Sequence, residues 1–254
     1  MLVDINLIML YLGLFLISIL YSSVGHGGAS GYLAILSLST FASMNSSWLK
    51  QHAWCLNLIV AAIAFYHYYK AGFYNKKLTI PFIVGSIPFA IIGGALKING
   101  DLYDYLLSIT LIWAAYRLYQ TKVVENNREI TDLGLKITLP IGGGVGFLSG
   151  IVGVGGGIFL SPIILLKKWA DPKTVAATSA LFIWVNSAAG LFGAGISNQL
   201  QIDFNILFPF IIVVLIGGII GSKFGTIAKQ SVVRTLLILV LIIAAGKRII
   251  EIFI

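Results

Sequence analysis

Long runs of apolar residues, separated by short polar connections, dominate the pattern of the chain. A helix that crosses a bilayer needs about 20 mostly apolar residues. Eight stretches are apolar enough to be membrane segments, and they cover residues 5–41, 52–69, 78–96, 102–116, 137–166, 174–195, 204–222 and 233–246. The pattern predicts an all-α integral membrane protein. Two of its stretches, 5–41 and 137–166, are long and broken by glycines.

Composition supports the membrane class. Hydrophobic residues make up 58% of the chain and charged residues 10%, whereas soluble domains carry about 25% charged residues. The net charge of +8 resides in short loops between apolar segments, which favours membrane topology over nucleic-acid binding. Cys55 is the single cysteine, so the sequence predicts neither a disulfide framework nor a cysteine metal site. We expect the lipid bilayer as a partner, and neither a cofactor nor a bound metal.

The chain contains an internal repeat. The glycine cluster VGHGGASGYLA at 24–34 recurs as VGVGGGIFLSP at 152–162, at an offset of 128 residues. Further matches at offsets of 128 to 130 pair 81–83 with 209–211, Gly93 with Gly221, Asn57 with Asn186, and 114–117 with 244–247. A repeat of this kind indicates a duplicated unit. We predict a first membrane repeat over 1–122, a polar cytoplasmic linker over 123–133, and a second membrane repeat over 134–254, which together form one membrane domain.

Charge predicts how the two halves are oriented. Cytoplasmic loops of membrane proteins are enriched in Lys and Arg. Eight simple crossings would divide the 17 basic residues 9 against 8 between the two sides. If each glycine-broken stretch is instead a re-entrant hairpin, each half crosses three times and the second half is inverted. One side then carries Lys70, Lys76, Lys77, Arg117, Lys122, Arg128, Lys136, Lys167, Lys168, Lys173, Lys223, Lys229 and Arg234, and the other carries Lys50, Lys97, Lys247 and Arg248. This division of 13 against 4 predicts two inverted repeats with both termini outside the cytoplasm.

The two glycine clusters are the candidate substrate site. Irregular backbone at membrane depth is tolerated where it is buried in protein or lines a cavity. Broken helices at matching positions of two halves are a sequence sign of a transport site, and helix starts attract anions. The candidate residues are Gly25, His26, Gly27 and Gly28 in the first cluster and Gly153, Gly155, Gly156 and Gly157 in the second. The alternative is close helix packing, which small residues also permit.

Polar residues inside the apolar segments complete the candidate site. His26 is an ionisable group expected near the midplane, where it could contact an anion, carry a proton, or be a neutral histidine bonded to a carbonyl. Asn57 and Asn186 occupy matching positions and either donate to the substrate or join helices. Thr178, Ser179 and Ser187 could act with Asn186. All nine Asp and Glu residues lie in loops or near segment ends, which favours an anionic or neutral substrate over a metal cation.

The glycine clusters resemble those of a known family. Two halves that each open with a G-x-G-G cluster, together with SGIVGVGGGIFLSP at 149–162 and the polar linker, resemble the TauE/SafE family of sulfite exporters. The resemblance covers essentially the whole chain. It implies a plasma-membrane transporter that exports a sulfur-containing anion such as sulfite, sulfoacetate or thiosulfate, with coupling to protons. An oligomer is compatible with the sequence.

Other functions stay open at this point. An anion channel would use the same glycines without coupling to a second ion, and a transporter of another small organic anion would share the architecture. A membrane scaffold would need neither. An intramembrane serine protease or a nucleotide-binding enzyme is disfavoured, because neither a G-x-S-G motif around Ser149 nor a G-K-[ST] motif occurs. We expect a transporter rather than an enzyme.

Overall fold

A computed structural model describes residues 5–37, 39–96, 116, 133–229 and, beyond these, 231–233, 235, 236, 238, 239 and 242. The helices with bounds inside these ranges are α1 (Ile5–Ser22), α2 (Ala29–Ser37), α3 (Ser46–Lys70), α4 (Lys76–Ala95), α6 (Leu135–Val152), α7 (Gly157–Leu166), α8 (Pro172–Ile196) and α9 (Phe204–Ile227). The stretch 5–41 is divided into α1 and α2 at the first glycine cluster, and 137–166 into α6 and α7 at the second. The predicted helical class is confirmed in these ranges. The segment 102–115 and the linker 123–132 lie outside the described residues.

The long helices begin at polar residues that cap them. The side chains of Asn45, Asn75, Asp171 and Asp203 accept hydrogen bonds from the first backbone amides of α3, α4, α8 and α9. Such caps satisfy amide groups that have no partner within the helix. These polar residues therefore fix where α3, α4, α8 and α9 start.

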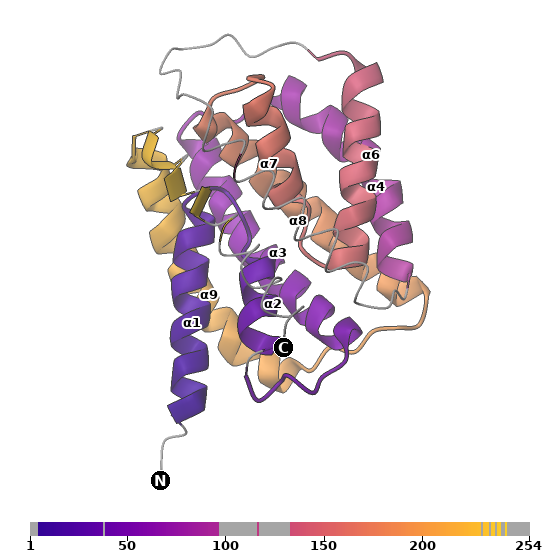
Figure 1. The fold of residues 1–254 in the computed structure, drawn as a ribbon, viewed down its shortest axis with the longest axis vertical. Coiled ribbons are helices and arrows are strands. Elements are labelled where there is room, and N and C mark those ends of the chain that lie inside the picture. Colours follow the sequence, from indigo (N-terminus) through magenta and orange to yellow (C-terminus); the bar gives the residue numbers. More distant parts are fainter. Residues whose placement is uncertain are drawn as a thin grey trace.

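The helices pack as two groups with corresponding members. In the first group, α9 packs against α1 and α3, and α2 lies against α3; in the second, α4 packs against α6 and α8, and α7 lies against α8. Helices α3 and α8 join the groups by packing against each other. The first group thus combines α1, α2 and α3 with α9, and the second combines α6, α7 and α8 with α4, so that each group takes one long helix from the other half (Figure 1).

Corresponding helices run in opposite directions in Figure 1. Helices α1, α3 and α9 run from the lower to the upper end of the view, whereas α6, α8 and α4 run from the upper to the lower end. Glycines allow the close crossings between these helices. A methyl group built on Gly142 or Gly146 of α6 would collide with the backbone of α4, and one on Gly221 of α9 with that of α1. Small residues permit such backbone approach in membranes.

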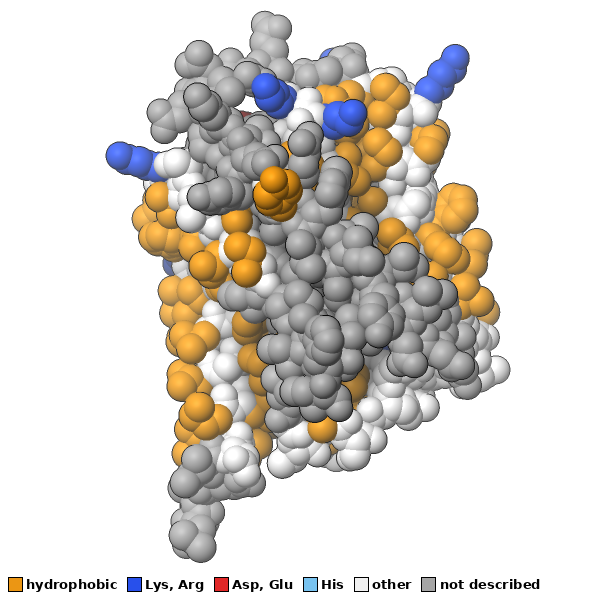
Figure 2. Space-filling view, in the orientation of Figure 1, with side chains coloured by type: hydrophobic (Ala, Val, Ile, Leu, Met, Phe, Trp, Pro, Cys, Tyr) orange, Lys and Arg blue, Asp and Glu red, His pale blue; other side chains and the backbone are white. Residues whose placement is uncertain are grey.

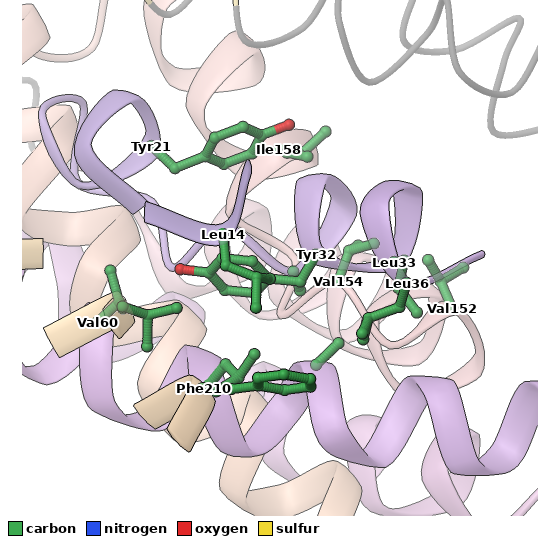
Figure 3. Close-up of a cluster of buried hydrophobic side chains, with 14 of the residues drawn as sticks. Leu14, Tyr21, Tyr32, Leu33, Leu36, Val60, Val152, Val154, Ile158 and Phe210 are labelled. Atoms are coloured by element: carbon green, nitrogen blue, oxygen red, sulfur yellow. The ribbon is translucent and has the colours of Figure 1, made fainter. Parts of the chain in front are cut away.

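The largest buried cluster joins the two halves. It contains Leu14 and Tyr21 of α1, Tyr32 and Leu36 of α2, Val60 of α3 and Phe210 of α9. Val152, Val154 and Ile158 of the second glycine-broken unit belong to the same cluster, and Figure 3 shows them beside these side chains. The second glycine cluster is therefore inserted into the core of the first group.

The surface of the described helices is suited to lipid. Helices α4, α6, α8 and α9 are each long and apolar enough to cross a membrane, while α1 and α7 are shorter apolar helices. Exposed side chains such as Phe204, Phe208, Phe192 and Ile227 are large and hydrophobic. Figure 2 shows hydrophobic side chains over the flanks of the visible face, and Lys side chains near its upper end. This distribution is that of a membrane protein.

Candidate functional site

Both glycine turns depend on backbone angles that favour glycine. Gly25 and Gly28 have φ values of +74° and +99°, and Gly153, Gly155 and Gly156 have values of +84°, +77° and +81°. Residues with a Cβ rarely adopt this region. Helix α1 ends with His26 N donating to Tyr21 O at 2.8 Å, and α6 ends with Gly153 N donating to Ser149 O at 2.9 Å. Each turn therefore ends one helix and starts a short one within a few residues.

The two turns meet at the side chain of Asn57, near the middle of α3. A methyl group built on Gly27 would overlap Asn57 Oδ1, and one built on Gly155 would lie 2.8 Å from Asn57 Nδ2. Real Cβ atoms do not approach other atoms so closely, so both glycines pack directly on opposite ends of one amide. The structure thus brings together three residues that the sequence singled out in separate segments.

Helix α8 forms the opposite wall of this meeting point. Asn57 Nδ2 donates to Ser187 Oγ at 3.2 Å. A methyl group on Gly155 would lie 2.7 Å from Ile183 Cγ2, and one on Gly157 would overlap the same side chain. Asn57, Ile183 and Ser187 are all buried. The two turns are consequently enclosed between α3 and α8.

The starts of the two short helices differ. Ala29 N, the first amide of α2, donates to Asn57 Oδ1 at 3.0 Å. Helix α7 begins at Gly157 after Gly156, with no side-chain cap. Uncapped amides at a helix start carry a partial positive charge. Of the two starts, that of α7 retains the greater capacity to bind an anion.

His26 is hydrogen-bonded to protein through both ring nitrogens. Nδ1 lies 3.0 Å from Val24 O, which can only accept, so Nδ1 carries the proton of a neutral ring. Nε2 lies 3.3 Å from Ser161 Oγ of α7, and Ser161 Oγ lies 2.6 Å from Ser179 Oγ of α8. A chain of three buried side chains therefore joins the first turn to α7 and α8, and includes the predicted Ser179.

Asn186 is hydrogen-bonded to α4 and to its own helix instead of to the glycine turns. Its Nδ2 donates to Ser86 Oγ of α4 at 3.0 Å and to Phe182 O of its own helix at 2.8 Å. Its Oδ1 is buried without a hydrogen-bond partner among the described residues. Asn57 and Asn186 match in sequence, but only Asn57 contacts both glycine turns.

Sequence reasoning missed Lys50, which it treated as a loop charge. The side chain packs on the second turn, because a methyl group on Gly153 would overlap Lys50 Cγ. Its ammonium lies 3.4 Å from both Gly150 O and Ile151 O and 5.0 Å from the centroid of the Trp54 ring. The spacing of Lys50, Trp54 and Asn57 at i, i+4 and i+7 was the available signal, because it places them on one helix face.

The charges near the site suit an anion. Among the described residues, no Asp or Glu is buried, and no three His, Cys, Asp or Glu residues lie close enough to hold a metal ion. Backbone amides, hydroxyl groups and the Asn57 amide are the polar groups available around the turns. They can donate hydrogen bonds to small oxyanions.

The sequence is similar to those of known membrane proteins over nearly its whole length. The family model described as "Sulfite exporter TauE/SafE" matches residues 10–248. A "Probable membrane transporter protein" of Sinorhizobium fredii is 33% identical over 249 residues, covering 96% of this chain and 98% of the relative. One of Bacillus subtilis is 25% identical, covering 91% of this chain and 95% of the relative. No solved structure matches the chain significantly.

Proposed function

The chain belongs to the sulfite exporter TauE/SafE family, and we propose that it is a secondary transporter of a small sulfur-containing anion. Sulfite, an organosulfonate or thiosulfate is the proposed substrate class, and export across the plasma membrane the proposed direction. The family description supports the sulfur anion. The absence of buried carboxylates among the described residues supports a negative charge on the substrate.

The observation that carries the proposal is the contact of both glycine turns with one amide. Gly27 packs on Oδ1 of Asn57, and Gly155 packs on Nδ2. A movement of either turn relative to α3 therefore changes the surroundings of the same side chain. We place the anion between the turns, held by the uncapped start of α7 and the Asn57 amide. Gly25, Gly28, Gly153 and Gly156 shape the two turns.

We propose that the two halves are inverted repeats that transport by alternating access. Two features support this architecture. Corresponding helices run in opposite directions in Figure 1. In addition, α9 of the second half packs against α1 and α3, just as α4 of the first half packs against α6 and α8. Rocking of one group of helices against the other would expose a central anion to each side in turn. The proposed repeats keep the predicted boundaries, 1–122 and 134–254.

We propose that the upper end of the molecule in Figure 1 faces the cytoplasm. Helix α3 ends there and α4, α6 and α8 begin there. The residues at these helix ends include Lys70, Lys76, Lys77, Lys136 and Lys173. Cytoplasmic ends of membrane helices are enriched in such residues. This orientation puts the N-terminus on the non-cytoplasmic side, and the inverted arrangement puts the C-terminus there too.

We propose that His26 positions the first turn against α7 rather than holding the anion. Both of its ring nitrogens have protein partners, Val24 O and Ser161 Oγ. The hydrogen-bonded chain of His26, Ser161 and Ser179 supports a structural link between the halves. Proton coupling remains a proposal that the pH profile of a variant tests.

The deciding experiment measures sulfite and thiosulfate flux in proteoliposomes, with and without a pH gradient. We expect saturable, gradient-dependent flux that Gly155→Leu abolishes, because leucine strains a φ of +77° and collides with Asn57 and Ile183. Gly144→Leu is the matched control, since Gly144 is also in a glycine-rich stretch but no atom lies within 4 Å of a Cβ there. This control should keep its flux.

Other outcomes separate the rival functions. Flux that does not saturate and follows only the substrate's own gradient would identify an anion channel. Flux of carboxylates but of neither sulfur anion would move the substrate to another organic acid. Equal flux in the Gly155→Leu and Gly144→Leu proteins would remove the glycine turns from the transport site.

A further inference from the structure

Lys50 is a cation that has no carboxylate partner within the part of the chain that the structure describes. Among the described residues its ammonium contacts Gly150 O and Ile151 O, each at 3.4 Å, and the face of Trp54. Hydrogen bonds from N–H groups are usually about 2.7 to 3.2 Å long, so both carbonyl contacts are weak. The charge is held by the carbonyl end of α6, which is partly negative. The Lys50 ammonium can therefore form a shorter, stronger hydrogen bond with an anion.

Trp54 carries a second group that can still form a hydrogen bond. Its ring is fully buried against Gly190 of α8, and its indole N–H has no hydrogen-bond partner among the described residues. A buried donor without an acceptor is costly. Such a group in a native structure indicates a missing partner. A cation and an unused donor therefore lie next to each other.

These two residues lead from the surface to the candidate site. Lys50 is half-buried, whereas Trp54 and Asn57 are completely buried. The three lie on one face of α3, and Lys50 and Asn57 are about 10 Å apart along the helix axis. Trp54 faces Gly190 and Asn57 bonds Ser187, one turn away on α8. Successive contacts between α3 and α8 thus run inward from Lys50.

We propose that Lys50 and Trp54 form an anion-binding subsite between the membrane face where α3 begins and the glycine turns. This inference rests on the proposed function, because it assigns the contact that the transported oxyanion makes on the non-cytoplasmic side, where export releases it. The anion takes over the Lys50 ammonium from Gly150 O and Ile151 O and accepts from the indole N–H. The aliphatic part of the Lys50 side chain packs on Gly153. Movement of Lys50 toward the anion therefore also changes the packing against the second turn.

Kinetics on both membrane faces test this subsite. Sulfite transport is measured in right-side-out and inside-out vesicles for wild type, Lys50→Met and Lys173→Met. Lys173 is the matched control: its ammonium also donates to a carbonyl at a helix end, Thr226 O at 2.7 Å, and lies 4.9 Å from the Phe73 ring. Methionine keeps an unbranched apolar stem in both variants.

We expect Lys50→Met to raise the KM for sulfite at least about five-fold from the face where α3 begins, because a nearby charge concentrates anions. From the opposite face the KM should change little, and kcat should stay close to wild type. Lys50→Arg should retain the wild-type KM, and so should Lys173→Met. An equal rise in KM for Lys50→Met and Lys173→Met would overturn the proposal.

Iodide quenching tests the subsite without transport. Iodide is an anion that quenches indole fluorescence on contact, and Trp54→Phe identifies the contribution of Trp54. We expect saturable quenching of Trp54 in the folded wild type and its loss in Lys50→Met, with unchanged quenching by neutral acrylamide. Saturable, Lys50-dependent quenching without sulfite flux would overturn the proposed substrate and leave the subsite standing. Sulfite flux together with iodide quenching that is the same in wild type and Lys50→Met would overturn the subsite alone.

Discussion

The starts of α2 and α7 occupy matching positions of the repeat but have different hydrogen-bond partners. The first amide of α2 donates to Asn57 Oδ1, while α7 begins without a side-chain cap. Asn186, which matches Asn57 in sequence, binds Ser86 and Phe182 O instead. Equivalent sequence positions therefore do not guarantee equivalent contacts.

One residue difference between the two halves contributes to this difference in partners. At the offset of 128 that aligns α4 with α9, Ser86 corresponds to Val214. Ser86 offers Asn186 an oxygen, whereas Val214 offers Asn57 none. The Asn57 amide is thus free to join the two turns, and the start of α7 is left for another partner. In the proposed site, this difference favours the start of α7 over the start of α2 as the place where the anion binds.

The largest effect should come from removing the amide that both turns share. Asn57→Ala leaves Ala29 N without its acceptor and opens space between Gly27 and Gly155. We expect it to lower the unfolding free energy by about 2 kcal/mol and the sulfite flux by about 30-fold or more. Flux in proteoliposomes and thermal unfolding in detergent measure the two effects.

Asn186→Ala is the matched control for Asn57→Ala. The Oδ1 of Asn186 already lacks a hydrogen-bond partner among the residues that the structure describes, and Ser86 Oγ keeps its own bond to Ile83 O. We therefore expect a flux within about three-fold of wild type. Equal losses in the two variants would mean that both amides hold the substrate, and the contrast between the helix starts would then have no functional meaning.

A smaller effect should follow when the first turn is made like the second. His26→Val introduces the residue type that Val154 supplies at the matching position. It removes the bonds to Val24 O and Ser161 Oγ, and we expect flux to fall about three- to ten-fold, because the turn loses its positioning contacts. The pH profile of the remaining flux is the decisive measurement. An unchanged profile supports positioning, and a profile that becomes flat would show that His26 carries the coupled proton.

The positions of the turns could be predicted from sequence, but their partners could not. The glycine clusters predict the breaks in 5–41 and 137–166, because positive φ and dense packing both require glycine there. The repeat likewise predicts which helices correspond. The choice of partner for Asn186 depends on the approach of α4 to α8, and local sequence does not encode that distance. Lys50 was missed for the same reason, since its contacts come from the end of α6, 100 residues away along the chain.

The smallest effect should come from the residue that holds Asn186 in place. Ser86→Ala removes the Oγ that accepts from Asn186 Nδ2, but Phe182 O still accepts from the same group. Hydrogen bonds between membrane helices contribute about 0.6 kcal/mol on average, so we expect a loss of unfolding free energy of that size. Flux should remain close to wild type, because the hydrogen bonds of Ser86 go to Ile83 O and Asn186 and to neither glycine turn. A flux change as large as that of Asn57→Ala would show that α4 shapes the anion site through Asn186, and the asymmetry between α2 and α7 would have to be explained by α4 instead of Asn57.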